Sequence, residues 1–202
     1  MSAVAFDRRA AELTELLKAC RDLSDILNPD ELYAAFAGII KNKFGISKLG
    51  LFVYDPEKET FELVFSYGLG KLNFKFKRGK KKLWETILQD KPFAVVDESG
   101  DPLFPKFLEK QDLKILPSRL WVPLVMRGEV IGLLTMGPKA GSQPFDDFEL
   151  YFLQQITAQA AVSINTCRLY ARRKREKEDL DKTLQNLSLL YSIGKAMNTS
   201  VT

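Results

Sequence analysis

Histidine is absent from the 202-residue sequence, and cysteine is rare. Without histidine the chain lacks the commonest acid–base side chain, the usual proximal haem ligand and the main ligand of zinc and non-haem iron sites. The two cysteines, Cys20 and Cys167, stand far apart in the sequence, which excludes a disulfide scaffold and a close-spaced metal motif. We therefore expect no metal site and a reducing, cytoplasmic location.

Long hydrophobic runs and a strong net charge are also missing. The longest uncharged run, residues 150–167, is interrupted by glutamine, serine and threonine, and so predicts an amphipathic helix and not a membrane span. The formal net charge is only +4, which is too small to imply a nucleic-acid partner. We expect neither a membrane segment in this chain nor a nucleic-acid partner.

The spacing of apolar residues predicts an α+β fold. Alternating runs and turn signals predict hairpins, so most of the sheet should be antiparallel. We expect a central sheet of five to six strands, flanked by helices from the N- and C-terminal ends of the chain. The predicted helices cover residues 7–28, 30–44, 80–90 and a long segment from 146 onward, and the predicted strands cover 48–54, 61–67, 72–78, 93–96, 120–125 and 130–136.

Local signals mark where these elements begin and end. Asp30 is a candidate N-cap for the second helix, and Gly45 is a candidate stop for it. Asp146 and Glu149 have the spacing of a capping box at the start of the last helix. Within the last predicted hairpin, Gly128 permits the positive φ of a tight turn.

Two stretches resemble the GAF domain family. Residues 84–97, WETILQDKPFAVVD, resemble its helix, its Lys-Pro corner and a buried strand ending in an acid. Residues 118–136, SRLWVPLVMRGEVIGLLTM, resemble its last hairpin, and the helix that follows ends in a similar Leu-Tyr pair. The resemblance covers residues 10–170 and implies a GAF domain that serves as a sensory module of a larger bacterial signalling protein.

The resemblance also implies a ligand pocket between the sheet and residues 91–119. The same large side chains could instead simply fill the core, with no ligand, and the sequence leaves both readings open. The residues that would line such a pocket are Phe65, Trp84, Phe93, Val95, Trp121 and Thr135.

Markers of the ligand-specific branches of the family are absent. The sequence has no Asn-Lys-x-Phe-Asp-Glu set of the cyclic-nucleotide type, and neither the histidine of haem-type members nor the Cys-His pair of bilin-type members. The methionine sulfoxide reductase branch uses several cysteines around its pocket, whereas both cysteines here fall on terminal helices. We therefore expect neither haem nor bilin, and the sequence does not indicate which other cofactor, if any, would bind. We do not expect an enzyme.

A basic segment, residues 71–82, holds seven lysines and arginines without one acid. With Phe74 and Phe76 interleaved, it could form a nucleic-acid-binding or anion-binding surface. An anion-binding surface suggests a second function, a module that binds an anionic small molecule such as a nucleotide. It could also be a strand with a buried phenylalanine face and a solvated lysine face, which is the interpretation that we favour.

The C-terminal segment predicts a helical connector. Residues 171–186 are a charged helical linker, and apolar residues recur from Leu180 through Leu184 and Leu187 to Tyr191 with heptad-like spacing. Residues 187–202 resemble the first helix and either open a second GAF-like domain or form a plain amphipathic tail. We expect a homodimer through the terminal helices that relays a signal to a downstream output domain of the same parent chain.

Overall fold

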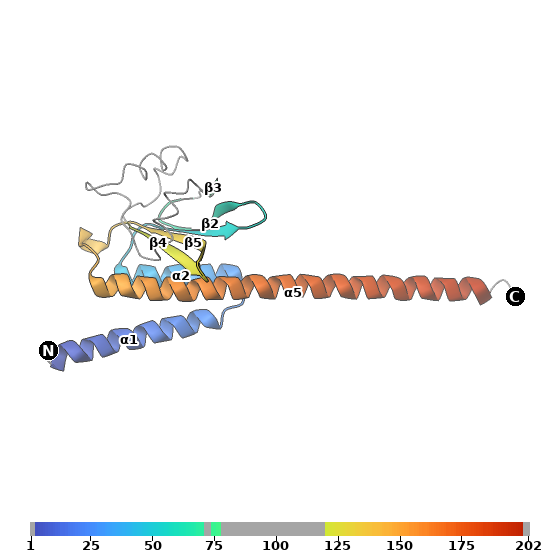
Figure 1. Ribbon diagram of the computed structural model, residues 1–202, viewed down its shortest axis with the longest axis horizontal. Helices are drawn as coiled ribbons and strands as arrows, with labels where there is room; N and C mark the ends of the chain where they lie inside the picture. The colour runs from blue at the N-terminus through green and yellow to red at the C-terminus, as the bar shows by residue number, and fades with distance from the viewer. Residues whose placement is uncertain (1–2, 71–73, 78–119, 200–202) are drawn as a thin grey trace. The chain divides into compact units, whose positions relative to one another are not determined.

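The computed structural model describes residues 3–70, 74–77 and 120–199 and confirms the α+β class (Figure 1). The chain divides into two compact units, Met1–Ile164 and Asn165–Thr202. The first unit holds the sheet and most of the helices, and the second consists of helix. The predicted helix at 80–90 and the predicted strand at 93–96 lie outside the described residues.

Within the part of the chain that the structure describes, five strands form one sheet in the order β3-β2-β1-β5-β4, and each adjacent pair is antiparallel. This arrangement confirms the mostly antiparallel sheet predicted from the hairpins. The strands are β1 (Leu49–Asp55), β2 (Thr60–Tyr67), β3 (Lys75–Lys77), β4 (Leu120–Met126) and β5 (Glu129–Met136).

The helices come from both ends of the chain. α2 and the first part of α5 lie along one face of the sheet, and α1 lies on the far side of these two helices (Figure 1). The helix-covered face of the sheet is lined by buried aliphatic side chains such as Leu51 and Leu134, and the helices contribute Phe36 and Ile156. The helices are α1 (Ala3–Ser24), α2 (Pro29–Phe44), the short 3-10 turn η2 (Ala140–Ser142) and α5 (Asp147–Thr199).

The start of α2 differs from the prediction. Asn28, and not Asp30, is the N-cap: its side-chain oxygen accepts hydrogen bonds from the backbone N–H groups of Asp30 at 2.9 Å and Glu31 at 3.3 Å. Pro29 occupies the first helical position, where a missing N–H costs nothing, so the cap falls one residue before the proline. The predicted stop is confirmed, because Gly45 adopts the left-handed conformation with φ 62°.

The capping box at the start of α5 is confirmed. The backbone N–H of Glu149 donates to Asp146 Oδ1 at 2.8 Å, and the N–H of Asp146 donates back to Glu149 Oε2 at 2.9 Å. Lys139 adds an ion pair to the same carboxylate, with Nζ 2.8 Å and 2.6 Å from its two oxygens. The loop after β5 is therefore fastened directly to the first turn of α5.

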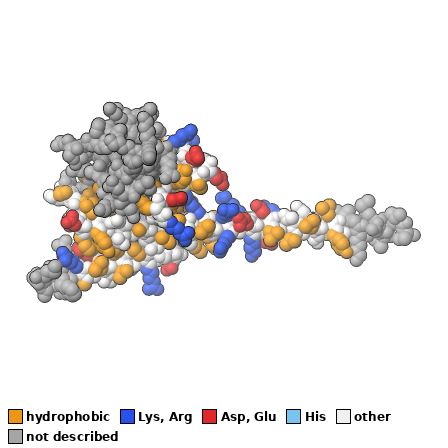
Figure 2. Space-filling view, viewed as in Figure 1, with side chains coloured by type: hydrophobic (Ala, Val, Ile, Leu, Met, Phe, Trp, Pro, Cys, Tyr) orange, Lys and Arg blue, Asp and Glu red, His pale blue; other side chains and the backbone are white. Residues whose placement is uncertain are grey.

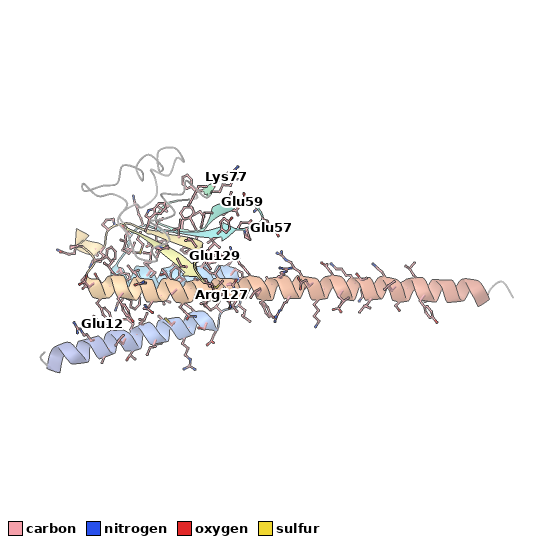
Figure 3. The ribbon with its side chains drawn as sticks, in the orientation of Figure 1. Glu12, Glu57, Glu59, Lys77, Arg127 and Glu129 are labelled. Atoms are coloured by element: carbon pink, nitrogen blue, oxygen red, sulfur yellow. The ribbon has the colours of Figure 1, made fainter. Side chains whose placement is uncertain are left out.

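The β4–β5 hairpin turns through Arg127 and Gly128, which both have positive φ, 52° and 80°. Two adjacent residues of this kind are typical of the two-residue hairpin turns that match strand twist, which confirms the role predicted for Gly128. The charged side chains at the turns, including Arg127, Glu129 and Glu57, lie at the ends of the hairpins (Figure 3).

Gly132 provides a test of the close approach between β5 and β1. A Cβ at Gly132 would lie 2.8 Å from the carbonyl oxygen of Phe52, so we expect Gly132→Ala to lower the free energy of unfolding by about 1–3 kcal/mol. At Gly38, within α2, nothing lies within 4 Å of an added Cβ. Gly38→Ala should therefore stabilise the helix by about 0.5–1 kcal/mol. Urea unfolding would measure both, and equal effects of the two variants would contradict the assignment.

Candidate functional site

The structure describes three of the six residues predicted to line a pocket. Trp84, Phe93 and Val95 lie outside the described residues, so their part in a pocket stays a prediction. Trp121, Thr135 and Phe65 lie on β4, β5 and β2.

Trp121 and Thr135 lie side by side. They are direct register partners in the β4–β5 pair, and both are fully buried. The Thr135 hydroxyl donates a hydrogen bond to the carbonyl oxygen of Gly50 at 3.3 Å. A Cβ at Gly50 would lie 2.9 Å from Thr135 Oγ1 and 3.4 Å from a methyl carbon of Leu63, so described side chains already crowd this point of the sheet.

Phe65 lies on the opposite face of the sheet. It pairs with Leu51, whereas the adjacent Gly50 pairs with Thr135, and neighbouring positions of a strand point to opposite faces. The cause is a β-bulge: Phe52 pairs with Leu63 but Leu51 pairs with Phe65, so β2 advances by two residues while β1 advances by one.

The bulge breaks the regular alternation of faces along β2. A regular strand would place Phe61, Leu63, Phe65 and Tyr67 on one face. In the structure Phe61 and Leu63 pack in the aromatic cluster, while the Tyr67 ring lies 4.2 Å from Nζ of Lys41 on α2. Phe65 consequently lies on the opposite face of the sheet from Trp121 and Thr135, and the ligand role of these three residues stays a prediction.

An aromatic cluster occupies the face of the sheet that carries Trp121. The rings of Phe52 and Phe76 meet edge-on with centroids 5.2 Å apart, and Phe61 stacks on Phe76 at 5.3 Å. Trp121 and Leu133 belong to the same buried cluster. In this part of the face the large side chains pack against one another, as the core-filling interpretation predicts.

The described part of the basic segment has one buried and one solvated face. On β3, Phe76 is buried, whereas Lys75 and Lys77 on either side are exposed. This pattern agrees with the favoured interpretation for these three residues. The other lysines of the segment lie outside the described residues.

A groove between α1 and α5 is a second candidate site, with a volume of about 430 Å³. Several of its side chains are well exposed: Leu13 at 44%, Leu17 at 70%, Tyr151 at 46% and Val162 at 50%. Among its lining residues that the structure describes, none is a lysine, arginine, aspartate or glutamate. Its lining consists of Leu13, Leu16, Leu17, Cys20, Tyr151, Gln155, Ala158, Gln159 and Val162.

The α5 side of this groove comes from the uncharged run at residues 150–167, which the sequence shows directly. Within that run Ala160 and Ala161 are buried, as expected for a helix that lies close to its neighbours, whereas Ala158 faces the groove. Apolar side chains are visible over α1 and the start of α5 in Figure 2. Which residues form the walls depends on how α1 lies against α5, and the sequence alone does not show this.

α1 is held in place by apolar packing and by polar contacts to α2 and α5. Leu16, Ala19 and Leu23 are buried on its inner face. An ion pair joins Glu15 to Lys43 of α2, and the side-chain amide of Gln159 donates to Ser24 Oγ at 3.0 Å. These contacts position the α1 wall of the groove.

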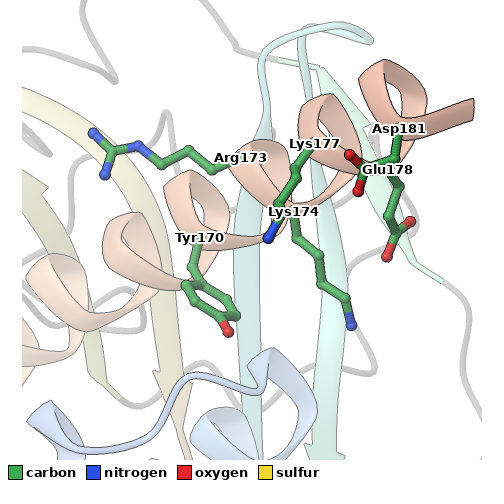
Figure 4. A pocket seen from close by; sticks show the side chains of 6 residues that line it. All are labelled: Tyr170, Arg173, Lys174, Lys177, Glu178 and Asp181. Carbon is green, nitrogen blue, oxygen red and sulfur yellow. The ribbon is translucent and has the colours of Figure 1, made fainter. Parts of the chain in front are cut away.

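The second unit carries a charged section followed by apolar side chains (Figure 2). A shallow hollow in the charged section is lined by Tyr170, Arg173, Lys174, Lys177, Glu178 and Asp181, all from α5 (Figure 4). Arg172 pairs with Glu176 one turn later, Nε to Oε1, at 2.8 Å. Pairs of this kind stabilise a solvated helix by a few tenths of a kcal/mol. The assignment of residues 171–186 as a linker stays a prediction.

Among the described residues, no cluster of three or more potential metal ligands exists, and no helix is long and apolar enough to cross a membrane.

The GAF domain family matches residues 27–165, which include all five strands, α2 and the start of α5. The chain belongs to the GAF domain family. This match covers more than half of the sequence and agrees with the resemblance seen in the last hairpin and helix. No curated protein matches the chain.

Solved structures show the same GAF fold. The GAF domain of an Acinetobacter phosphoenolpyruvate-protein phosphotransferase is 14% identical, with a TM-score of 0.59 over 84% of this chain and 97% of that one. The corresponding domain from Coxiella burnetii is 18% identical, with a TM-score of 0.58 over 79% and 96%. Residues 122 to 287 of a methyl-accepting chemotaxis protein are 14% identical, with a TM-score of 0.58 over 75% and 98%.

The cysteines allow a test of the groove. Burial raises the pKa of the Cys20 thiol above its ordinary value, and burial also raises that of Cys167. Because the thiolate is the reactive form, a raised pKa lowers its population at pH 8. We expect iodoacetamide to alkylate both cysteines several-fold more slowly in the folded GAF domain than in urea, with the rate rising at higher pH than for free cysteine. Peptide mass spectrometry would measure each site, and a folded-state rate for Cys20 equal to that in urea would contradict the burial.

Proposed function

We propose that this GAF domain is a regulatory, non-catalytic module of a cytoplasmic signalling protein. It dimerises through its terminal helices and relays a signal to a downstream output domain of the same parent chain. The observation that supports this proposal most strongly is the uncharged groove between α1 and α5, with its exposed Leu17 and Val162.

The chemistry of the groove fits a second copy of the chain. Exposed apolar surface of this extent is unusual on a monomer and marks interaction sites. The described residues that line the groove are apolar side chains, a thiol, a phenol and two amides. Two identical grooves can therefore meet about a twofold axis without placing like charges together.

The link between β5 and α5 gives a route for the signal. Lys139 stands three residues after the end of β5 and holds Glu149 in the first turn of α5. Both side chains are largely buried, at 14% and 21% exposure, so the ion pair is less screened than one on the open surface. A displacement of β5 would move the start of α5 and bias how two copies of α5 pack.

The alternative function, binding of an anionic small molecule such as a nucleotide, rests on the basic segment and on the predicted pocket. The exposed Lys75 and Lys77 are its only described lysines. Thermal-shift measurements with millimolar nucleotides would test this function, because a ligand that binds only the folded state raises the melting temperature. No shift with any nucleotide would rule it out.

A paired substitution in the groove tests the dimer. We expect the unaltered chain to sediment as a dimer at micromolar concentration. Leu17→Lys with Val162→Lys should raise the dimer dissociation constant at least tenfold, because four like charges would be buried in one interface. Leu27→Lys is the matched control: this leucine is 45% exposed but does not line the groove, and its variant should remain dimeric.

Analytical ultracentrifugation would measure the dissociation constants, and the far-UV circular dichroism of each variant would show that it is folded. An unaltered chain that stays monomeric at all concentrations would contradict the proposal. So would a folded double variant that dimerises as tightly as the unaltered chain.

A further inference from the structure

The heptad-like stripe of the second unit is an exposed apolar face of α5. Leu180, Leu184 and Leu187 are 58%, 56% and 57% exposed, and Tyr191, four residues further on, is 76% exposed. Successive residues of a helix are about 100° apart, so these four side chains lie within about 60° of one another around the helix axis. This spacing is typical of the seam of a two-stranded coiled coil. In the proposed dimer a second copy of α5 would cover it.

Two cations continue the stripe toward the start of the second unit. Counted back from Leu180 with the same spacing, the next seam positions are Lys177 and Arg173. They lie about 60° and about 20° from Leu180 around the axis, so both belong to the face that the leucines occupy. Both also line the shallow hollow of Figure 4. The seam is therefore apolar in its last part and cationic before it.

Neither seam cation has an ion-pair partner among the residues that the structure describes. Glu176, which stands between Arg173 and Lys177 in the sequence, is instead paired with Arg172 at 2.8 Å. A charge that enters a helix pair without a partner loses its hydration and gains no attraction in return. These two positions therefore oppose the close pairing that the leucines favour.

We propose that Arg173 and Lys177 hold the charged sections of the two α5 helices apart in the proposed dimer, while the helices pair along Leu180 to Tyr191. This arrangement rests on the proposed function, in which both exit helices run in the same direction toward the output domain. A twofold axis along such a pair places each seam residue opposite the same residue of the second copy. Four cations then meet in two successive layers of the seam and repel one another.

This repulsion keeps the relay adjustable. With a continuous apolar seam, one packing of the two helices would be strongly favoured, and a signal would have to overcome a large difference in free energy. The charged section lowers that difference. A small displacement passed along α5 is then enough to change the fraction of dimers in which this section is closed.

Completion of the seam with leucine tests the proposal. Arg173→Leu with Lys177→Leu removes the repulsion and extends the apolar stripe, so the dimer dissociation constant of the full chain should fall about tenfold or more. Arg175→Leu with Lys182→Leu is the matched control. It removes the same charge and adds the same two leucines, but at positions about 140° and 160° from Leu180, on the opposite side of the helix. Its dissociation constant should stay within about threefold of that of the unaltered chain.

A charge reversal tests whether the two cations face their own copies. Arg173→Glu with Lys177→Glu keeps four like charges in the seam, so this variant alone should pair no more tightly than the unaltered chain. When it is mixed with the unaltered chain, the heterodimer should be about tenfold or more tighter than either homodimer, because each glutamate then faces a cation.

Analytical ultracentrifugation with one chain labelled would measure the dissociation constants, and far-UV circular dichroism would show that each variant is folded. A folded leucine variant that dimerises no more tightly than its control would overturn the proposal, and so would a mixture without a preferred heterodimer.

The same series separates this proposal from the proposed dimer. If the unaltered chain is monomeric at all concentrations, the proposed dimer is contradicted. The repulsion is then still supported if the leucine variant dimerises where its control does not, and it is overturned if the leucine variant also stays monomeric.

Discussion

The fold depends on the position of β5 between β1 and β4. β5 pairs with both neighbours, and at Gly132 it approaches β1 so closely that a Cβ would meet a backbone oxygen. The same strand runs into the loop whose Lys139 holds the start of α5. β5 therefore connects its two neighbouring strands to the start of α5. Because the interior is closely packed, a displacement of β5 would also displace β1, β4 and the start of α5.

The two faces of the sheet have different chemistry. The buried side chains of one face are aliphatic and pack against α2 and α5, with Phe65 and Tyr67 of β2 less buried on the same face, and the other face carries the aromatic cluster around Phe76. The bulge in β2 decides which of its aromatic residues serves which face. Phe61 joins the cluster while Phe65 faces the helices, so a single extra residue sets the composition of both sides.

The N- and C-terminal helices both leave large apolar side chains exposed. In the first unit Leu17 and Val162 remain exposed beside a buried inner face, and in the second unit Leu187 and Leu190 are exposed on two sides of α5. Exposed apolar faces of this kind are costly unless partners cover them. They favour the proposed dimer, in which a second copy of the chain would cover the apolar surface of the first unit.

Local interactions made part of this structure predictable from sequence. The Asp146–Glu149 capping box, the Gly45 stop and the Arg127–Gly128 turn each depend on residues within a few positions of one another, so their residue types were sufficient. The cap at Asn28 was missed by two residues, because Asp30 is an equally good capping residue and only the helix start distinguishes them. The side of the sheet taken by Phe65 and the leucines of α1 that line the groove were decided by tertiary structure. Both depend on the pairing of segments far apart in the chain, and no local pattern encodes a bulge or the rotation of one helix against another.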